Sequence, residues 1–339
     1  MTLIMTAALS IALSSAAVGT PRTCVKCHAA QAGPQPSTSM AHALELASEC
    51  RILSTHPLLT FSAGKYKYRI VRSGNESIYS VTDGRETITE PIRWAFGLGA
   101  AGQTYVFEKD GALYQSRVSY YRDIDGLDKT IGAGNAEPAT LREAAGQMMD
   151  RGESVACFGC HATDAVVHNQ LTLQSMTPGV QCERCHGPTE NHLEGIHRGD
   201  AKLAAMRDLK ALSTEDISNF CGQCHRTWEQ IAAGGKLGIS DIRFQPYRLT
   251  NSKCYDTEDR RISCIACHDP HREVDRVDSN YDAKCQACHA GGKPEARACK
   301  VSDRNCVACH MPKLDLPGSH FKFTDHQIRI VRANEAYPN

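Results

Sequence analysis

The chain lacks the features that suit a protein to nucleic acids or to a membrane interior. Its 339 residues carry 38 Lys and Arg against 38 Asp and Glu, so the polypeptide has no formal net charge. A nucleic-acid partner would require a basic excess, and this balance argues against one. Beyond the N-terminus no apolar stretch approaches 18 residues, and the mean hydropathy is −0.38. These absences indicate a soluble body of one large domain or two ordinary ones.

The N-terminal segment, residues 1–19, is uncharged and consists mostly of apolar and small residues. Ser15-Ala16-Ala17 and Ala17-Val18-Gly19 both satisfy the small-residue rule that precedes a signal cleavage site. We therefore expect a cleaved signal peptide over 1–19. An uncleaved anchor is the alternative, since 19 apolar residues nearly span a bilayer.

Cysteine and histidine are the residues in excess, with 17 Cys and 15 His. Fourteen of the cysteines fall in seven copies of Cys-x-x-Cys-His, which chance would produce about 0.04 times in a chain of this composition. The copies begin at Cys24, Cys157, Cys182, Cys221, Cys264, Cys285 and Cys306, their second cysteines are Cys27, Cys160, Cys185, Cys224, Cys267, Cys288 and Cys309, and their histidines are His28, His161, His186, His225, His268, His289 and His310.

This spacing is typical of covalent haem attachment. Two thiols one helical turn apart reach the two vinyl groups of a haem, and the next residue places its imidazole under the iron. A zinc ribbon needs two pairs and no following histidine, a thioredoxin-like pair would occur once, and a disulfide framework has no reason to repeat one spacing. We therefore expect seven covalently attached haem c groups, each iron held by a motif histidine.

The second axial position of each iron needs a further ligand, and eight histidines lie outside the motifs. Seven irons and eight spare imidazoles would let every haem be six-coordinate with one histidine left over, and His197 is the weakest candidate. Met40 competes with His42 for one iron. The candidate distal ligands are His42, His56, His168, His192, His271, His320 and His326.

Three cysteines lie outside the motifs: Cys50, Cys254 and Cys299. Haem attachment in bacteria takes place outside the cytoplasmic membrane, where two of the three could pair. We expect a Cys254–Cys299 disulfide that joins two haem-bearing loops, with Cys50 free and buried.

Haem-motif density divides the chain. We expect a signal peptide over 1–19, a first haem segment over 20–57, a haem-free segment over 58–156 and a six-haem domain over 157–339. The six-haem domain has too few residues per haem to build a core of side chains. We therefore expect the haem macrocycles to form its core. The predicted fold is mainly α, with extensive irregular loops wrapped around stacked c-type haems and a small antiparallel β-sheet insert over about 60–120.

The sheet is expected because 65–70 and 77–81 alternate with the period of half-buried strands, and Asp83-Gly84 and Asp110-Gly111 are hairpin-turn dipeptides. Residues 38–49, 137–150 and 200–235 are expected to contribute helices.

Four segments carry a resemblance to a known family: 179–188, 264–271, 309–313 and 323–326. Together they resemble bacterial multihaem cytochromes c related to the tetrahaem nitrifier cytochrome that accepts electrons from hydroxylamine oxidoreductase. The resemblance covers about 150–330 and implies stacked haem pairs that pass electrons along a chain. It also implies distal-ligand roles for His192, His271 and His326. The chain departs from the tetrahaem type by its seven motifs.

The expected function is electron transfer by an exported heptahaem cytochrome in the periplasm or at the cell surface of a bacterium. Its expected partners are redox proteins, such as other cytochromes and quinol-oxidising or terminal reductase complexes. Seven haems add about fourteen propionate charges, which makes the holoprotein acidic. The alternatives are a multihaem reductase of nitrogen or sulfur oxyanions with one open haem, and a subunit of an extracellular haem filament. No catalytic residue is predicted.

Overall fold

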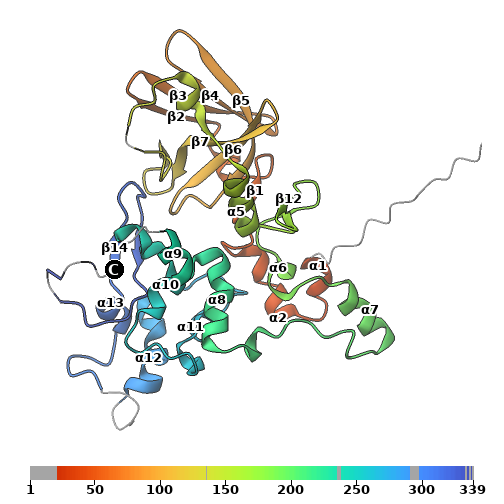
Figure 1. Ribbon diagram of the computed structural model, residues 1–339, viewed down its shortest axis with the longest axis vertical. Coiled ribbons are helices and arrows are strands. Elements are labelled where there is room, and N and C mark those ends of the chain that lie inside the picture. The colour runs from red at the N-terminus through yellow and green to blue at the C-terminus, as the bar shows by residue number, and fades with distance from the viewer. Residues whose placement is uncertain are drawn as a thin grey trace, which may run out of the picture.

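The structure is a computed structural model that describes residues 21–134, 136–234, 238–290, 298–332, 334, 335 and 337. The expected signal peptide over 1–19 lies outside these residues. Figure 1 shows a sheet in orange and yellow and a set of short helices in green and blue, with the red helices α1 and α2 beside the green α6 and α7. In the described ranges, no helix is long and apolar enough to cross a membrane.

Nine antiparallel strands form the sheet. Seven of them run in the order β2-β3-β4-β5-β6-β7-β8, while β1 pairs with β5 and β9 pairs with β7. Their bounds are β1 Leu44–Leu46, β2 Leu58–Ala63, β3 Tyr66–Ser73, β4 Glu76–Thr82, β5 Thr87–Phe96, β6 Gln103–Lys109, β7 Ala112–Tyr121, β8 Gly126–Lys129 and β9 Gly146–Met148.

Local sequence explains the strand pairs. Along β3 the side chains of Tyr66, Tyr68 and Ile70 are buried and those between them are exposed, which is the two-residue period of a half-buried strand. Asp110 and Gly111 link β6 to β7 with φ of 52° and 75°, the positive angles that a tight two-residue hairpin turn requires. The hairpin predicted at Asp110-Gly111 is confirmed.

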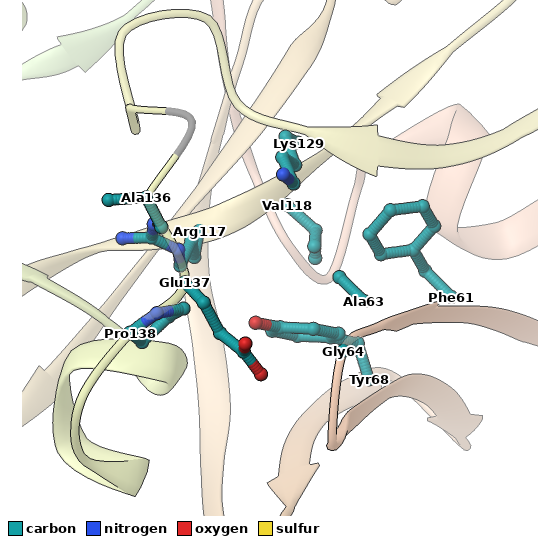
Figure 2. A pocket seen from close by; sticks show the side chains of 10 residues that line it. All are labelled: Phe61, Ala63, Gly64, Tyr68, Arg117, Val118, Lys129, Ala136, Glu137 and Pro138. Atoms are coloured by element: carbon teal, nitrogen blue, oxygen red, sulfur yellow. The ribbon is translucent and has the colours of Figure 1, made fainter.

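The sheet curls until its edge strands β2 and β8 approach each other, so that it is nearly closed. Irregularities in register between Ile92 and Trp94, and between Thr104 and Val106, help the strands to bend. Figure 2 shows the pocket at this seam, lined among others by Phe61 of β2 and Lys129 of β8. Its volume of about 100 Å³ is small, so the seam is nearly filled by side chains.

Aromatic side chains fill the inside of the sheet. The rings of Phe107 and Tyr114 stack with centres 5.6 Å apart and planes 10° from parallel. The hydroxyl of the buried Tyr79 donates to the carbonyl of Ala145 at 2.8 Å, which satisfies its polar end. This part of the chain therefore has a side-chain core of its own.

The predicted fold class is wrong. The structure is 33% helical and 24% strand, and a large sheet dominates it, so the protein is not mainly α with a small insert over 60–120. Because the haem-motif-free block contains enough buried aromatic and aliphatic residues to form its own core, the sheet extends from β1 to β9. Residues 38–49, expected to be helical, form turns and β1, and 137–150 forms the short α4 and then β9.

Short helices make up the rest of the chain. They are α1 Pro21–Cys24, α2 Ala29–Ala32, α3 Arg51–Thr55, α4 Leu141–Ala145, α5 Arg151–His161, α6 Cys182–His186, α7 Glu190–Arg198, α8 Thr214–His225, α9 Trp228–Gly234, α10 Gln245–Thr250, α11 Cys264–Cys267, α12 Asp282–His289 and α13 Cys306–His310. Three two-stranded ribbons, β10/β13, β11/β12 and β14/β15, lie between them at 162–163 and 177–178, 166–167 and 170–171, and 313–315 and 322–324.

Helix α5 joins the two parts of the molecule (Figure 1). It begins with a capping box, in which Asp150 accepts from the amide of Glu153 and Glu153 accepts from the amide of Asp150. Phe158 of α5 is fully buried, and its ring meets the rings of Trp94 and Phe96 of β5 edge to face at 5.2 and 5.0 Å. These contacts attach the sheet to the helix that carries the second cysteine motif.

Candidate cofactor sites in the helical part

The seven Cys-x-x-Cys-His motifs occupy equivalent places, at or just after the end of a helix. Helices α5, α6, α8, α12 and α13 end on the motif histidine itself, α11 ends one residue before His268, and α1 ends on Cys24, the first residue of its motif. The amides of His28 and His268 donate to the carbonyls of Cys24 and Cys264 at 2.8 and 2.9 Å, which is helical spacing. Each motif thus presents two thiols and an imidazole from one turn.

Within the part of the chain that the structure describes, three motif histidines have a second imidazole close to their own ring. In each case the partner comes from a distant part of the chain that follows a different motif. The ring centres are 6.2 Å apart for His28 and His192, 6.1 Å for His186 and His271, and 6.2 Å for His268 and His326.

This separation fits an iron with two axial histidines. A metal binds an imidazole nitrogen at about 2 Å and the ring centre lies about 1 Å further out, so rings on opposite sides of one metal have centres about 6 Å apart. Rings in direct van der Waals contact would lie closer. The distances and the thiols beside them therefore fit a haem c at each of the three places.

Hydrogen bonds leave one ring nitrogen free to bind a metal in several of the motif and candidate distal histidines. Nδ1 of His161 lies 2.9 Å from the carbonyl of Ala43, and Nδ1 of His192 lies 2.6 Å from that of Ala204. A carbonyl only accepts, so Nδ1 carries the proton and Nε2 keeps the lone pair that binds a metal. His326 makes the same contact with the carbonyl of Thr324 at 3.0 Å.

Burial keeps the imidazoles neutral. It lowers the pKa of His161, His186, His225 and His268 below the ordinary value, and it lowers the pKa of His326 to about 4. The neutral imidazole is the form that binds a metal, so burial favours ligation over protonation at neutral pH.

Cysteines of different motifs lie next to one another. A side-chain hydrogen bond links Cys160 to Cys224 and another links Cys221 to Cys264, and these bonds raise the pKa of Cys160 and of Cys221. These contacts bring the second motif to the fourth and the fourth to the fifth.

Two more thiol contacts extend the series. Cys182 is hydrogen-bonded to Cys24, and Cys306 to Cys285, so the third motif adjoins the first and the seventh adjoins the sixth. Electrostatic interactions join the remaining neighbours, Cys185 to Cys224 and Cys267 to Cys285. The motifs therefore follow one another in space as first, third, fourth, fifth, sixth and seventh, with the second beside the fourth.

The other candidate ligands have different neighbours. Nδ1 of His42 lies 3.0 Å from a carboxylate oxygen of Glu45, and Met40 is half-buried nearby. His168 and His197 are exposed, the first in the turn between β11 and β12 and the second near the end of α7.

His56 and His320 belong to the sheet surface. His56 lies between the carbonyl of Ile52 at 2.8 Å and the carboxylate of Asp125 at 3.0 Å, so both of its nitrogens are engaged. Nε2 of His320 lies 2.8 Å from the carboxylate of Asp128 in β8, and its ring packs on Tyr121.

The three cysteines outside the motifs are free thiols, so the structure does not contain the Cys254–Cys299 disulfide. Cys50 is fully buried and donates to the side-chain oxygen of Gln103 at 3.3 Å. Burial raises its pKa to about 11. Cys299 is exposed, and Cys254 lies near Cys285.

Sequence reasoning missed a buried ion pair beside one of the facing histidines. Arg248 of α10 binds Asp325, which precedes His326, and both side chains are 0% exposed. Arg329 binds the same carboxylate at 2.6 Å. Asp325 lay in one of the segments that carry the family resemblance, but no local pattern marks Arg248 as its partner.

Comparisons with known proteins find similarity to cytochromes. The family model described as cytochrome c554 and c-prime matches residues 129–187, which include the second and third motifs. The multiheme cytochrome MtrA of Shewanella baltica (strain OS185) is 25% identical over 159 residues, which cover 44% of this chain and 37% of that protein. The chain thus spans little more than a third of this relative's length.

A solved structure shares the fold. The crystal structure of the outer cell wall cytochrome OcwA superposes with a TM-score of 0.50 at 14% sequence identity, over 90% of this chain and 78% of that one.

Proposed function

The chain belongs to the multihaem cytochromes c, and from this we propose that it carries electrons along seven covalently bound haems. Haem c binding and electron carriage are properties that it shares with this family. The number of haems, their ligands, the location and the partners are our proposals. Haem iron takes up and releases one electron at a time, and two axial imidazoles keep its coordination the same in both states.

The observation that carries the proposal is the continuous series of motif contacts. Because side-chain hydrogen bonds or electrostatic interactions link the cysteines of neighbouring motifs, the groups that these cysteines would hold would lie next to one another. We propose that each pair of motif cysteines forms two thioethers and that each motif histidine is the proximal ligand. The proposed attachment residues are Cys24, Cys27, Cys157, Cys160, Cys182, Cys185, Cys221, Cys224, Cys264, Cys267, Cys285, Cys288, Cys306 and Cys309.

We propose three distal ligands from the facing rings. His192 serves the first motif, His271 the third and His326 the fifth, as the ring distances of 6.1 and 6.2 Å support. Each distal histidine follows a different motif from the one it serves, so ligation ties separate loops together. Carbonyl and carboxylate groups at Nδ1 hold the rings in orientation.

We propose that the protein is exported and works in the periplasm or at the cell surface. Covalent haem attachment outside the cytoplasmic membrane supports this, and so does the likeness in fold to an outer cell wall cytochrome. About fourteen propionates would make the holoprotein acidic, which favours docking on basic surfaces of redox partners such as other cytochromes.

The test is the electron paramagnetic resonance spectrum of the oxidised holoprotein, followed by reduction and addition of CO. For the three irons with an assigned distal histidine we expect low-spin signals and no CO-induced shift, so at most four haems per chain should bind CO. Binding of more than four CO per chain to the wild type would contradict these ligand assignments and would favour the alternative, a reductase with an open haem.

A further inference from the structure

A buried ion pair lies beside the segment that carries His326. The side chains of Arg248 and Asp325 are 0% exposed, and Nε and Nη2 of Arg248 donate to the two carboxylate oxygens at 2.8 and 3.0 Å. Such a bidentate pair fixes orientation as well as distance. Since either charge alone would be costly to bury, the pair holds its two chain segments in one relative position.

The residues after Arg248 also bind the backbone around His326. The hydroxyl of Ser252 donates to the carbonyl of His326 at 3.1 Å and accepts from the amide of Ile328 at 2.8 Å. The segment 325–328 is therefore attached at its start by Arg248 and along its length by Ser252.

The carboxylate of Asp325 shapes this segment from within. It accepts from the amide of Gln327 at 3.0 Å and from Nη1 of Arg329 at 2.6 Å, while the amide of Asp325 donates to the carbonyl of Pro312 at 2.9 Å. Loss of the carboxylate would release the turn on which the imidazole of His326 stands.

The same helical unit holds the facing histidine. Helix α10, which carries Arg248, packs against α8, and so does α11, which immediately precedes His268. The hydroxyl of Tyr281 lies 3.5 Å from Nδ1 of His268 and donates to the carbonyl of Asp275 at 2.8 Å. The elements that position His326 and His268 thus pack against the same helix, α8.

We infer that Arg248 is a positioning residue that, through Asp325, holds the imidazole of His326 opposite His268 as a distal ligand. This inference rests on the proposed function, because it assumes an iron between the two rings. A purely structural role predicts that loss of Arg248 lowers stability and nothing else. A positioning role predicts in addition that the axial site opens.

The experiment compares holoprotein variants by the CO bound per chain after dithionite reduction, with haem per chain counted by the pyridine haemochrome. The variants are Arg248→Lys, His326→Ala and the double variant. We expect His326→Ala to bind one more CO per chain than the wild type. We expect the same gain with Arg248→Lys and no further gain in the double variant, because both changes open one site.

The control is Arg72→Lys. Arg72 is a half-buried arginine of β3 that donates to the carbonyls of Ala47 and Ser48 at 2.8 and 3.0 Å, so its loss should lower the melting temperature without a gain in CO. If Arg248→Lys does not accumulate as holoprotein, Asp325→Asn, which keeps the shape of the side chain, is measured in its place.

An unchanged CO count in Arg248→Lys with a lowered melting temperature would overturn the inference while leaving the function intact. An unchanged CO count in His326→Ala, with the haem count unaltered, would instead overturn the ligand assignment under the proposed function. The two failures are therefore distinguishable.

Discussion

The imidazole rings of His186 and His271 face each other with centres 6.1 Å apart and planes 10° from parallel. His186 ends α6, whereas His271 lies in the loop after α11, with its Nδ1 3.1 Å from the carboxylate of Asp269. This separation of the ring centres fits two axial ligands on one metal.

Replacement of His271 should therefore open one iron. We expect His271→Ala to retain seven haems, to gain a high-spin signal equivalent to one haem, and to bind one more CO per chain than the wild type. His197→Ala is the matched control, because His197 is an exposed histidine near the end of α7. If both variants show the same spectrum as the wild type, the pairing with His186 is wrong.

His320 should behave differently from the facing histidines. Its Nε2 lies 2.8 Å from Asp128, so we expect it to attach the loop between β14 and β15 to the sheet instead of binding iron. His320→Ala should leave the CO count and the low-spin signals unchanged. A gain of one CO per chain in this variant would restore His320 to the ligands, as the sequence alone suggested.

The contact between the sheet and α5 should contribute strongly to stability. Phe158 is 0% exposed between Trp94 and Phe96, and truncation of a buried phenylalanine costs about 3–5 kcal/mol of unfolding free energy. Phe158→Ala should keep its haems, since the motif cysteines and histidine remain, but should unfold at lower denaturant concentration when followed by circular dichroism. Phe61→Ala, at the half-buried seam of the sheet, should cost clearly less; an equal cost would contradict the account.

Cys50 should make stability depend on pH in the alkaline range. Its pKa is raised from 9.0 to about 11 by burial, so between these values the unfolded chain loses a proton that the folded chain keeps. The folded state therefore loses stability as pH rises from about 9 to 11, by at most about 3 kcal/mol.

The free-energy difference between the wild type and Cys50→Ala should accordingly shrink from pH 8 to pH 11, as measured by anaerobic denaturation. Cys299→Ala is the control, because hydrogen bonds from the amides of Ser302 and Val301 lower the pKa of the exposed Cys299 thiol, which excludes a change of the same sign. A constant difference for Cys50→Ala would show that this thiol ionises normally.

Local chemistry made some features readable from the sequence. A Cys-x-x-Cys-His motif needs only one helical turn, so its spacing predicts where a haem is attached. The Asp110-Gly111 hairpin is equally local, since two positive φ angles define it. The start of α8 is local in the same way, because the Ser213 hydroxyl accepts from the amide of Asp216 as an N-cap.

Long-range relationships could not be read in the same way. The sheet is larger than expected because β9 returns to pair with β7, and no local pattern in 146–148 marks a strand. The histidines that lie close to His28, His186 and His268 follow other motifs in the chain. Sequence spacing therefore does not tell which spare histidine serves which motif. Arg248 and Asp325 are 77 residues apart, and only the folded chain shows that they form one buried pair.

The most direct test of the central claim is a coulometric titration of the oxidised holoprotein under anaerobic conditions, followed at the haem absorption band. The account predicts that absorbance change and charge uptake end together at seven electrons per chain, one for each motif. An end point below seven would contradict it, because at least one motif would then hold no haem or a haem outside the conducting series.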